Sequence, residues 1–101
     1  MTHKLLQIDF AFDGPWGGEL AAALGGLAQD IAAEKGLAWK LWTENPAERR
    51  AGGIYLFDDD DARARYLEKH TARLAAFGVR EIVARAFDVN APLSALTRAP
   101  L

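Results

Sequence analysis

One histidine is the first candidate among the residues that could carry chemistry. The chain of 101 residues has two histidines, and His70 follows Tyr66 by one helical turn on the apolar side of an expected helix. A half-buried imidazole can titrate near neutral pH and act as a general base. The same position suits a core histidine hydrogen-bonded to the backbone or to Tyr66, and the residues alone favour that interpretation. His3 lies near the terminus and is expected to have no role.

Aromatic side chains form the second group of candidates. Such rings can line a pocket and stack on a flat substrate. Any single ring is more often ordinary core, but several large rings beside one imidazole favour a pocket. The group comprises Trp16, Trp39, Trp42, Tyr55, Tyr66 and five phenylalanines, Phe10 among them.

The other motifs give weaker evidence for a functional site. The run Asp58 to Asp61 lacks the glycine and distal glutamate of a calcium loop, and its place before a helix predicts capping of the first turn instead of a metal site. The glycines around Gly14 and Gly52 do not have the spacing of phosphate-binding loops. Ser94 is the only serine and lies in the C-terminal arm, which argues against a serine triad. Arg85 could hold an anionic group, but a surface ion pair is the simpler expectation.

Composition excludes several classes of function. The chain has no cysteine, which removes disulfides, thiolate metal sites and cysteine nucleophiles. Its 12 basic and 14 acidic residues give a net charge of −2 without a basic stripe, so nucleic acid is not an expected partner. No run is apolar and long enough to cross a membrane, and residues 1–13 do not read as a signal peptide. We therefore expect a cytoplasmic protein.

The elements that must position these side chains follow from periodicity. Strands are predicted over residues 5–12, 37–44, 52–57 and 79–89, where apolar residues alternate or run together. A first helix is predicted with an apolar stripe from Trp16 to Ile31 and an end at Gly36, with a kink or a close backbone approach at Gly25-Gly26. A second helix is predicted from about Asp58 to Phe77, ended by Gly78. A short arm with Leu93, Leu96 and Leu101 follows.

This order predicts one domain, residues 1–101, with an α+β fold. Strand, helix, strand, strand, helix, strand is the ferredoxin-like βαββαβ arrangement, with an antiparallel sheet and both helices on one face. The other face would also be apolar, because strand 52–57 offers Ile54 and Leu56 on one side and Tyr55 and Phe57 on the other. A face of this kind exceeds the patch usual on a monomer. We therefore expect a homodimer with sheets packed face to face and the arm across the neighbour.

Several stretches resemble the bacterial YdhR family of monooxygenases. The resemblance covers nearly the whole chain, and the looser matches fall in the first helix and in the turn at residues 45–50. It rests on residues 5–15 (LLQIDFAFDGP), 51–57 (AGGIYLF), 66–74 (YLEKHTARL) and 87–94 (FDVNAPLS), and segment 39–44 fits as well.

The resemblance implies a dimeric α+β barrel in the group of antibiotic-biosynthesis monooxygenases. Members of that group oxygenate aromatic polyketide-like substrates with O₂ and no cofactor or metal, while others degrade haem or isomerise lactones. In the mechanism it implies, His70 removes a proton from a phenolic substrate, and the carbanion passes an electron to O₂. The pocket walls would come from Trp39, Trp42, Tyr55, Tyr66 and Phe10.

Two further interpretations stay open from the sequence. The first is a non-catalytic dimeric barrel that binds small aromatic or apolar ligands, in which His70 does no chemistry. The second is an isomerase on the same scaffold, which would turn over substrate without consuming oxygen. The sequence does not decide which tryptophan faces a pocket, because Trp39 and Trp42 are predicted on opposite sides of one strand.

Overall fold

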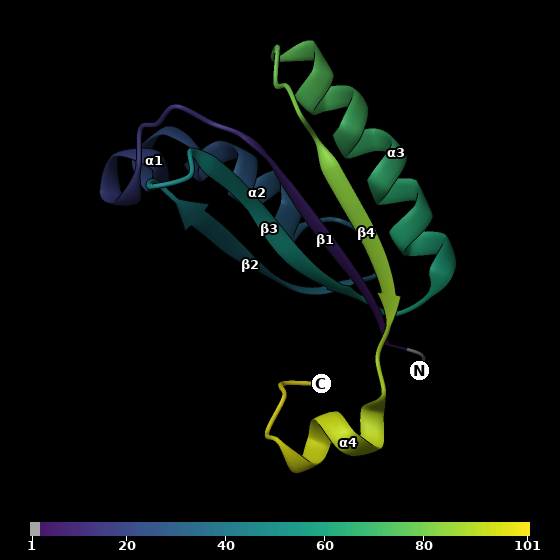
Figure 1. The fold of residues 1–101 in the computed structure, drawn as a ribbon. Coiled ribbons are helices and arrows are strands. Elements are labelled where there is room, and N and C mark those ends of the chain that lie inside the picture. Colours follow the sequence, from purple (N-terminus) through teal and green to yellow (C-terminus); the bar gives the residue numbers. More distant parts are fainter. Residues whose placement is uncertain (1–2) are drawn as a thin grey trace.

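The computed structural model describes residues 3–101. Within this range the strands are β1 (Lys4–Ala11), β2 (Leu37–Asn45), β3 (Arg50–Phe57) and β4 (Val83–Asp88). The helices are α1 (Gly17–Ala23), α2 (Gly25–Ala32), α3 (Asp60–Ala76) and α4 (Ala91–Leu96). The predicted order of strands and helices is confirmed, with α4 as an addition in the C-terminal arm (Figure 1).

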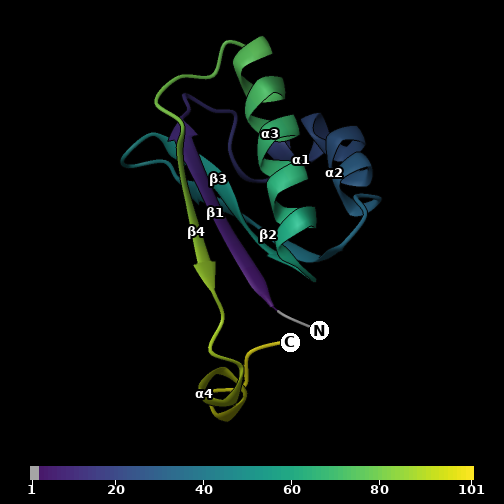
Figure 2. The same ribbon diagram turned by 90° about the vertical axis from the view of Figure 1, so that its right-hand side faces the viewer.

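The strands of residues 3–101 form one antiparallel sheet in the order β2-β3-β1-β4. Its two inner strands are β3 and β1, and β1 pairs with both β3 and β4. Helices α1, α2 and α3 lie on one side of this sheet, and the opposite side faces away from them (Figure 2). The predicted α+β, ferredoxin-like fold is therefore confirmed for one copy of the chain.

Strand alternation builds the core. Leu6 and Ile8 of β1 point toward the helices and are 0% and 1% exposed, and Tyr55 and Phe57 of β3 lie beside them. Helix α3 packs onto these residues. The helical contribution to this buried cluster is Ile31, Ala62, Tyr66 and Leu74.

The first helical region differs from the single helix predicted over Trp16 to Ile31. Helix α1 ends at Ala23 and α2 begins at Gly25, with Leu24 between them at φ −106° and ψ 12°. Leu24 still donates to the Leu20 carbonyl, and Ala28 donates to Leu24, so the axis bends without a complete break. A Cβ atom at Gly25 or Gly26 would meet nothing within 4 Å, so no close backbone approach requires these glycines, and the low helix propensity of adjacent glycines accounts for the bend.

The last strand is shorter than the predicted span 79–89. It begins at Val83, because Glu81 adopts a positive φ of 56° that turns the chain out of the extended path. Val79 and Ile82 still pack against the core, which explains their apolar character. Strand β3 begins two residues before the predicted start and α3 two residues after it, at Arg50 and Asp60.

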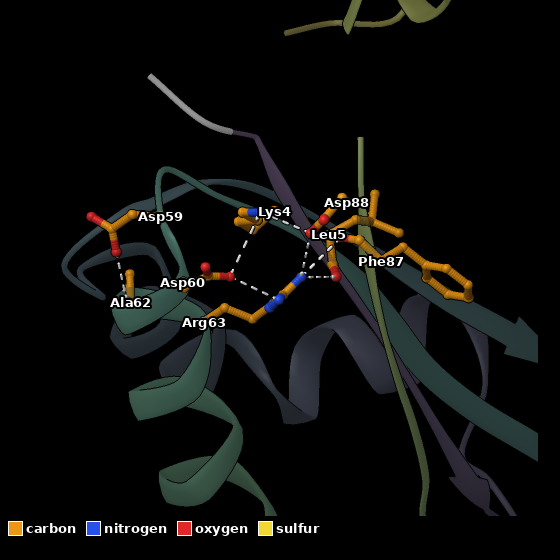
Figure 3. Close-up of polar contacts among 8 residues, drawn as sticks. All are labelled: Lys4, Leu5, Asp59, Asp60, Ala62, Arg63, Phe87 and Asp88. Carbon is orange, nitrogen blue, oxygen red and sulfur yellow. Dashed lines mark hydrogen bonds and ion pairs between the residues drawn. The ribbon is translucent and has the colours of Figure 1, made fainter. Parts of the chain in front are cut away.

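The acidic run caps α3 and fastens it to the sheet, as Figure 3 shows. Asp59 accepts a hydrogen bond from the Ala62 amide at 2.8 Å, and Asp60 accepts one from Arg63 at 3.0 Å. Arg63 also donates to the Phe87 carbonyl of β4 at 2.9 Å. Asp59 thus caps the helix as the sequence predicted, while Asp60 lies in the first turn and pairs with the Arg63 side chain.

The second face of the sheet carries a cluster of apolar side chains, with Gln7 and Arg85 paired beside it. Leu5 stands opposite Leu56 on one side and opposite Phe87 on the other, and Trp39 pairs in register with Leu56. Leu41 and Phe87 on this face are 57% and 47% exposed. Between residues 3 and 101 no helix is both long and apolar enough to cross a membrane.

The C-terminal arm returns to its own chain. Asn90 caps α4 by accepting from the Leu93 amide at 3.1 Å. Beyond the helix, the Pro100 carbonyl accepts a hydrogen bond from Trp39 Nε1 at 2.7 Å. The arm was expected to lie across a neighbouring copy, and here its end contacts the second sheet face of the same chain.

Candidate active site

A cavity of about 230 Å³ lies between the sheet and the helices. Leucines of α1, the Leu24 bend and α2 form one wall, and the end of α3 forms another. Its polar contributions come from Lys40, Thr43, Tyr55 and His70. The apolar lining includes Phe10, Phe12, Leu20, Leu24, Leu27, Trp42, Leu74 and Phe77. A small ring fits this volume, since an apolar cavity of roughly 150 Å³ already holds benzene.

A second hollow of about 410 Å³ adjoins the cavity. Leu20, Leu24 and Trp42 border both spaces, so these three side chains form the partition between them. Glu44 borders the outer hollow and accepts a hydrogen bond from the Gly17 amide at 2.7 Å. A substrate larger than one ring would extend from the cavity past Trp42.

His70 faces the cavity from the middle of α3 and is 2% exposed. Arg73, one turn further on the same helix, donates to His70 Nδ1 from Nε at 3.2 Å and from a terminal nitrogen at 2.9 Å. A guanidinium has donors only, so Nδ1 must be the acceptor. The neutral ring therefore carries its proton on Nε2.

This environment gives His70 a different role from the base expected from the sequence. Burial lowers the pKa of His70 to about 3, with further lowering by the positive charges of Lys40 and Arg73. Its Nδ1 lone pair is occupied by Arg73, and its Nε2 already holds a proton. At neutral pH the imidazole acts as a hydrogen-bond donor, not as a proton acceptor.

Arg73 is itself held by a carboxylate from another helix. Its terminal nitrogen lies 2.8 Å from an Asp30 oxygen, and Asp30 belongs to α2. The connection from Asp30 to Arg73 to His70 thus links α2 and α3 behind the cavity. It fixes the orientation of the imidazole ring, in the way that outer partners orient a functional group.

Both tyrosines pack beside His70, and Tyr66 stacks on its ring. The Tyr66 ring lies 5.0 Å from the His70 ring at 21°, and the Tyr55 ring lies 4.9 Å from Tyr66. Burial raises the pKa of both phenols, and Tyr55 adds to the rise at Tyr66. Tyr55 borders the cavity, whereas the Tyr66 hydroxyl is buried and has no hydrogen-bond partner within residues 3–101.

Lys40 is the polar group of the cavity that the sequence reasoning missed. Its ammonium lies 3.3 Å from the centroid of the Trp42 ring and 4.7 Å from that of Tyr55. Burial lowers the pKa of Lys40 to about 7, and Arg73 contributes. The signal was present in the sequence, because strand alternation puts Lys40 and Trp42 on one face.

Gly53 makes room for this lysine. A Cβ atom at Gly53 would lie 2.5 Å from Lys40 Cε and 3.2 Å from Tyr55 Cζ. The missing side chain lets the lysine stem cross β3 and reach the cavity. The Gly52-Gly53 pair, which does not fit a phosphate loop, thus serves close packing inside the sheet.

The structure brings together five of the six candidate residues. His70, Tyr55, Trp42 and Phe10 border the cavity, and Tyr66 packs behind His70. Trp39 lies on the opposite sheet face, paired in register with Leu56 and bonded to the C-terminal arm. Within the described residues no group of three or more His, Cys, Asp or Glu side chains could hold a metal ion.

The sheet order and helix placement define an α+β protein with a ferredoxin-like fold. The chain shares its fold with NE2512, a protein of unknown function from Nitrosomonas europaea (TM-score 0.68, 19% identity, 89% of this chain and 91% of that one). It also resembles SnoaB, a cofactor-independent oxygenase from Streptomyces nogalater (TM-score 0.62, 17% identity, 87% and 93%). A third structure is described as a "putative antibiotic biosynthesis monooxygenase" from Deinococcus radiodurans (TM-score 0.57, 18% identity, 86% and 92%).

A family model gives the specific assignment. The model described as "Putative mono-oxygenase ydhR" matches residues 5–100, so the chain belongs to this family. No curated protein sequence matches the chain.

Proposed function

We propose that this protein is a cofactor-independent monooxygenase that oxygenates small phenolic or polyketide-like aromatic compounds with O₂. The observation that carries the proposal is the 230 Å³ apolar cavity with a lysine, a tyrosine and a histidine on its walls, in a member of a mono-oxygenase family. Its fold is shared with a cofactor-independent oxygenase, which supports the same reaction type.

The reaction needs little covalent chemistry from the protein. The substrate loses a proton, and the resulting carbanion passes one electron to O₂. The radical pair then recombines, and loss of water leaves a carbonyl in place of the oxidised CH₂ group. The walls formed by Trp42, Tyr55 and Phe10 hold the ring and keep water out, while His70 Nε2–H donates to the developing oxyanion.

The cavity also constrains substrate size. Its volume lies below the roughly 300–1,000 Å³ of common ligand pockets, so a single substituted ring fits within it. A fused polycyclic substrate needs the adjoining 410 Å³ hollow beyond Trp42 as well.

A homodimer is part of the proposal. The second sheet face carries Leu41 and Phe87 at 57% and 47% exposure next to Leu5 and Ile54, an apolar surface that a second copy would cover. Sedimentation at micromolar concentration tests it, and a stable monomer would contradict it.

The alternative is a non-catalytic barrel that binds small aromatic or apolar ligands. The neutral, donor-only state of His70 favours it, because the residue expected to be the base does not accept a proton at neutral pH.

Oxygen uptake separates the two functions. The purified protein is supplied with a panel of dihydroxy-aromatics and anthrones, and oxygen consumption is followed beside His70→Gln and the surface variant Lys69→Met. The oxygenase predicts uptake that falls at least tenfold in His70→Gln and stays unchanged in Lys69→Met. Tight binding without uptake by any compound would support the binder.

A further inference from the structure

Lys40 is a half-buried amine in an apolar cavity that has no carboxylate on its walls. Among residues 3–101 its ammonium forms no ion pair, and its closest contacts are the faces of Trp42 and Tyr55. An unpaired buried charge is costly unless a partner arrives or the group gives up its proton.

The other charged groups around the cavity do not supply that partner. From α3, His70 is neutral and Arg73 is positive. Asp30 of α2 already pairs with Arg73 at 2.8 Å, and Glu44 of β2 accepts from the Gly17 amide. Tyr55 of β3 is neutral, because burial raises the pKa of its phenol. Among the described residues, no carboxylate therefore borders the cavity itself.

We propose that Lys40 accepts the acidic proton of the substrate, and that the cavity binds phenols and enols as their anions. In this step the O–H bond of the ligand breaks, an N–H bond forms on Lys40 Nζ, and an ammonium–oxyanion pair results. No electron moves, so the step balances without an oxidant. Lys40 thereby takes the base role that His70 cannot fill, while His70 Nε2–H remains a donor to the oxyanion.

The protonation state of the free site agrees with this role. Burial lowers the pKa of Lys40 to about 7, so a useful fraction of the amine is neutral at physiological pH. General-base catalysis is most effective when the pKa of the base lies near the working pH. The assignment rests on the proposed function only for the choice of ligand class.

Proton uptake on binding tests the assignment without any oxygen chemistry. The probe is 4-nitrophenol at pH 8, where it is mainly anionic in solution. Calorimetric titrations in two buffers of different ionisation enthalpy give the number of protons taken up per bound probe. With Lys40 mainly neutral before binding, we expect uptake of about 0.9 proton in the wild type.

Substitutions of Lys40 distinguish its role as a proton acceptor from that of a positive charge that pairs with the bound anion. Lys40→Arg keeps a permanent cation, so it should bind the anion but take up no proton. Lys40→Met should raise the Kd at least tenfold, and the surface variant Lys69→Met should keep the wild-type uptake. Circular dichroism verifies that each variant is folded.

Three results would overturn the assignment: a wild type that binds no nitrophenolate, a wild type that binds it without proton uptake, or the same uptake in Lys40→Arg. Failure of oxygen consumption, by contrast, would count against the proposed function and leave proton uptake by Lys40 intact.

Discussion

Arg73 donates two hydrogen bonds to the same nitrogen of His70, at 3.2 and 2.9 Å. The two residues are three positions apart on α3, a spacing that puts side chains on one helix face. This contact decides the tautomer of the imidazole, and with it the chemistry open to the residue.

Stability should depend on pH through His70. The unfolded imidazole titrates near 6.5 and the folded one near 3, so the unfolded chain binds more protons between these values. The contribution of His70 to the free energy of unfolding is therefore fully present above pH 6.5. The free energy of unfolding falls by up to about 1.4 kcal/mol per pH unit as the pH drops from 6.5 toward 3. Urea unfolding of wild type and His70→Gln measures this. If the free energy of unfolding changed equally with pH in both proteins, that result would contradict a buried, neutral His70.

Gly53→Ala should expel Lys40 from the cavity. The new Cβ atom would lie 2.5 Å from Lys40 Cε and 3.1 Å from the Leu41 carbonyl, so we expect a loss of about 1–3 kcal/mol in the free energy of unfolding. The ¹³C shift of labelled Lys40 Cε, which should titrate near pH 7 in the wild type, should move toward the range of exposed lysines.

Gly18→Ala is the matched control for this substitution. Nothing lies within 4 Å of a Cβ atom there, and the site is helical, so stability should stay equal or rise. A titration of Lys40 that is the same in Gly53→Ala and the wild type would show that Gly53 does not position the lysine.

Removal of the Tyr66 hydroxyl should not harm the protein. This oxygen is buried without a hydrogen-bond partner in the described part of the chain, and an unsatisfied polar group costs about 1–3 kcal/mol. We expect Tyr66→Phe to unfold at an equal or higher urea concentration. A clear loss of stability in this variant would mean that the hydroxyl is bonded in solution.

Deletion of residues 99–101 should uncover the second sheet face. The deletion removes the Pro100 carbonyl that binds Trp39 Nε1 at 2.7 Å, together with Leu101, which borders the same hollow as Leu56. Trp39 fluorescence should shift to longer wavelength, as judged against Trp39→Phe with and without the deletion. An unchanged spectrum would indicate that the arm does not rest on Trp39 in solution.

The sequence predicted the fold well, because the alternation of side chains along a strand determines which face of the sheet each residue occupies. The period-two pattern placed Leu6 and Ile8 together, and it correctly separated Trp39 from Trp42 on the two faces of β2. The bend at Leu24 was foreseen as a kink, but its division into two helices depends on backbone angles. The early end of the extended path at Glu81 depends on one positive φ, which no periodicity reports.

The site was predicted in part. His70, Tyr55 and Trp42 were among the candidates that periodicity and resemblance brought together, but the sequence did not decide between Trp39 and Trp42 as the tryptophan of the pocket. The contact between Arg73 and His70 is local and was within reach of the sequence. The pairing of Arg73 with Asp30 of α2 and the reach of Lys40 across Gly53 join distant segments, so only the assembled fold discloses them.

The salt link between α2 and α3 makes cavity width and the orientation of His70 depend on each other. Leu24 and Leu27 form the wall that a bulky guest must push aside, and Asp30 extends from the same helical segment. Arg73 of α3 holds both Asp30 on that segment and the His70 imidazole, so one guanidinium couples the position of the leucine wall to the orientation of the ring.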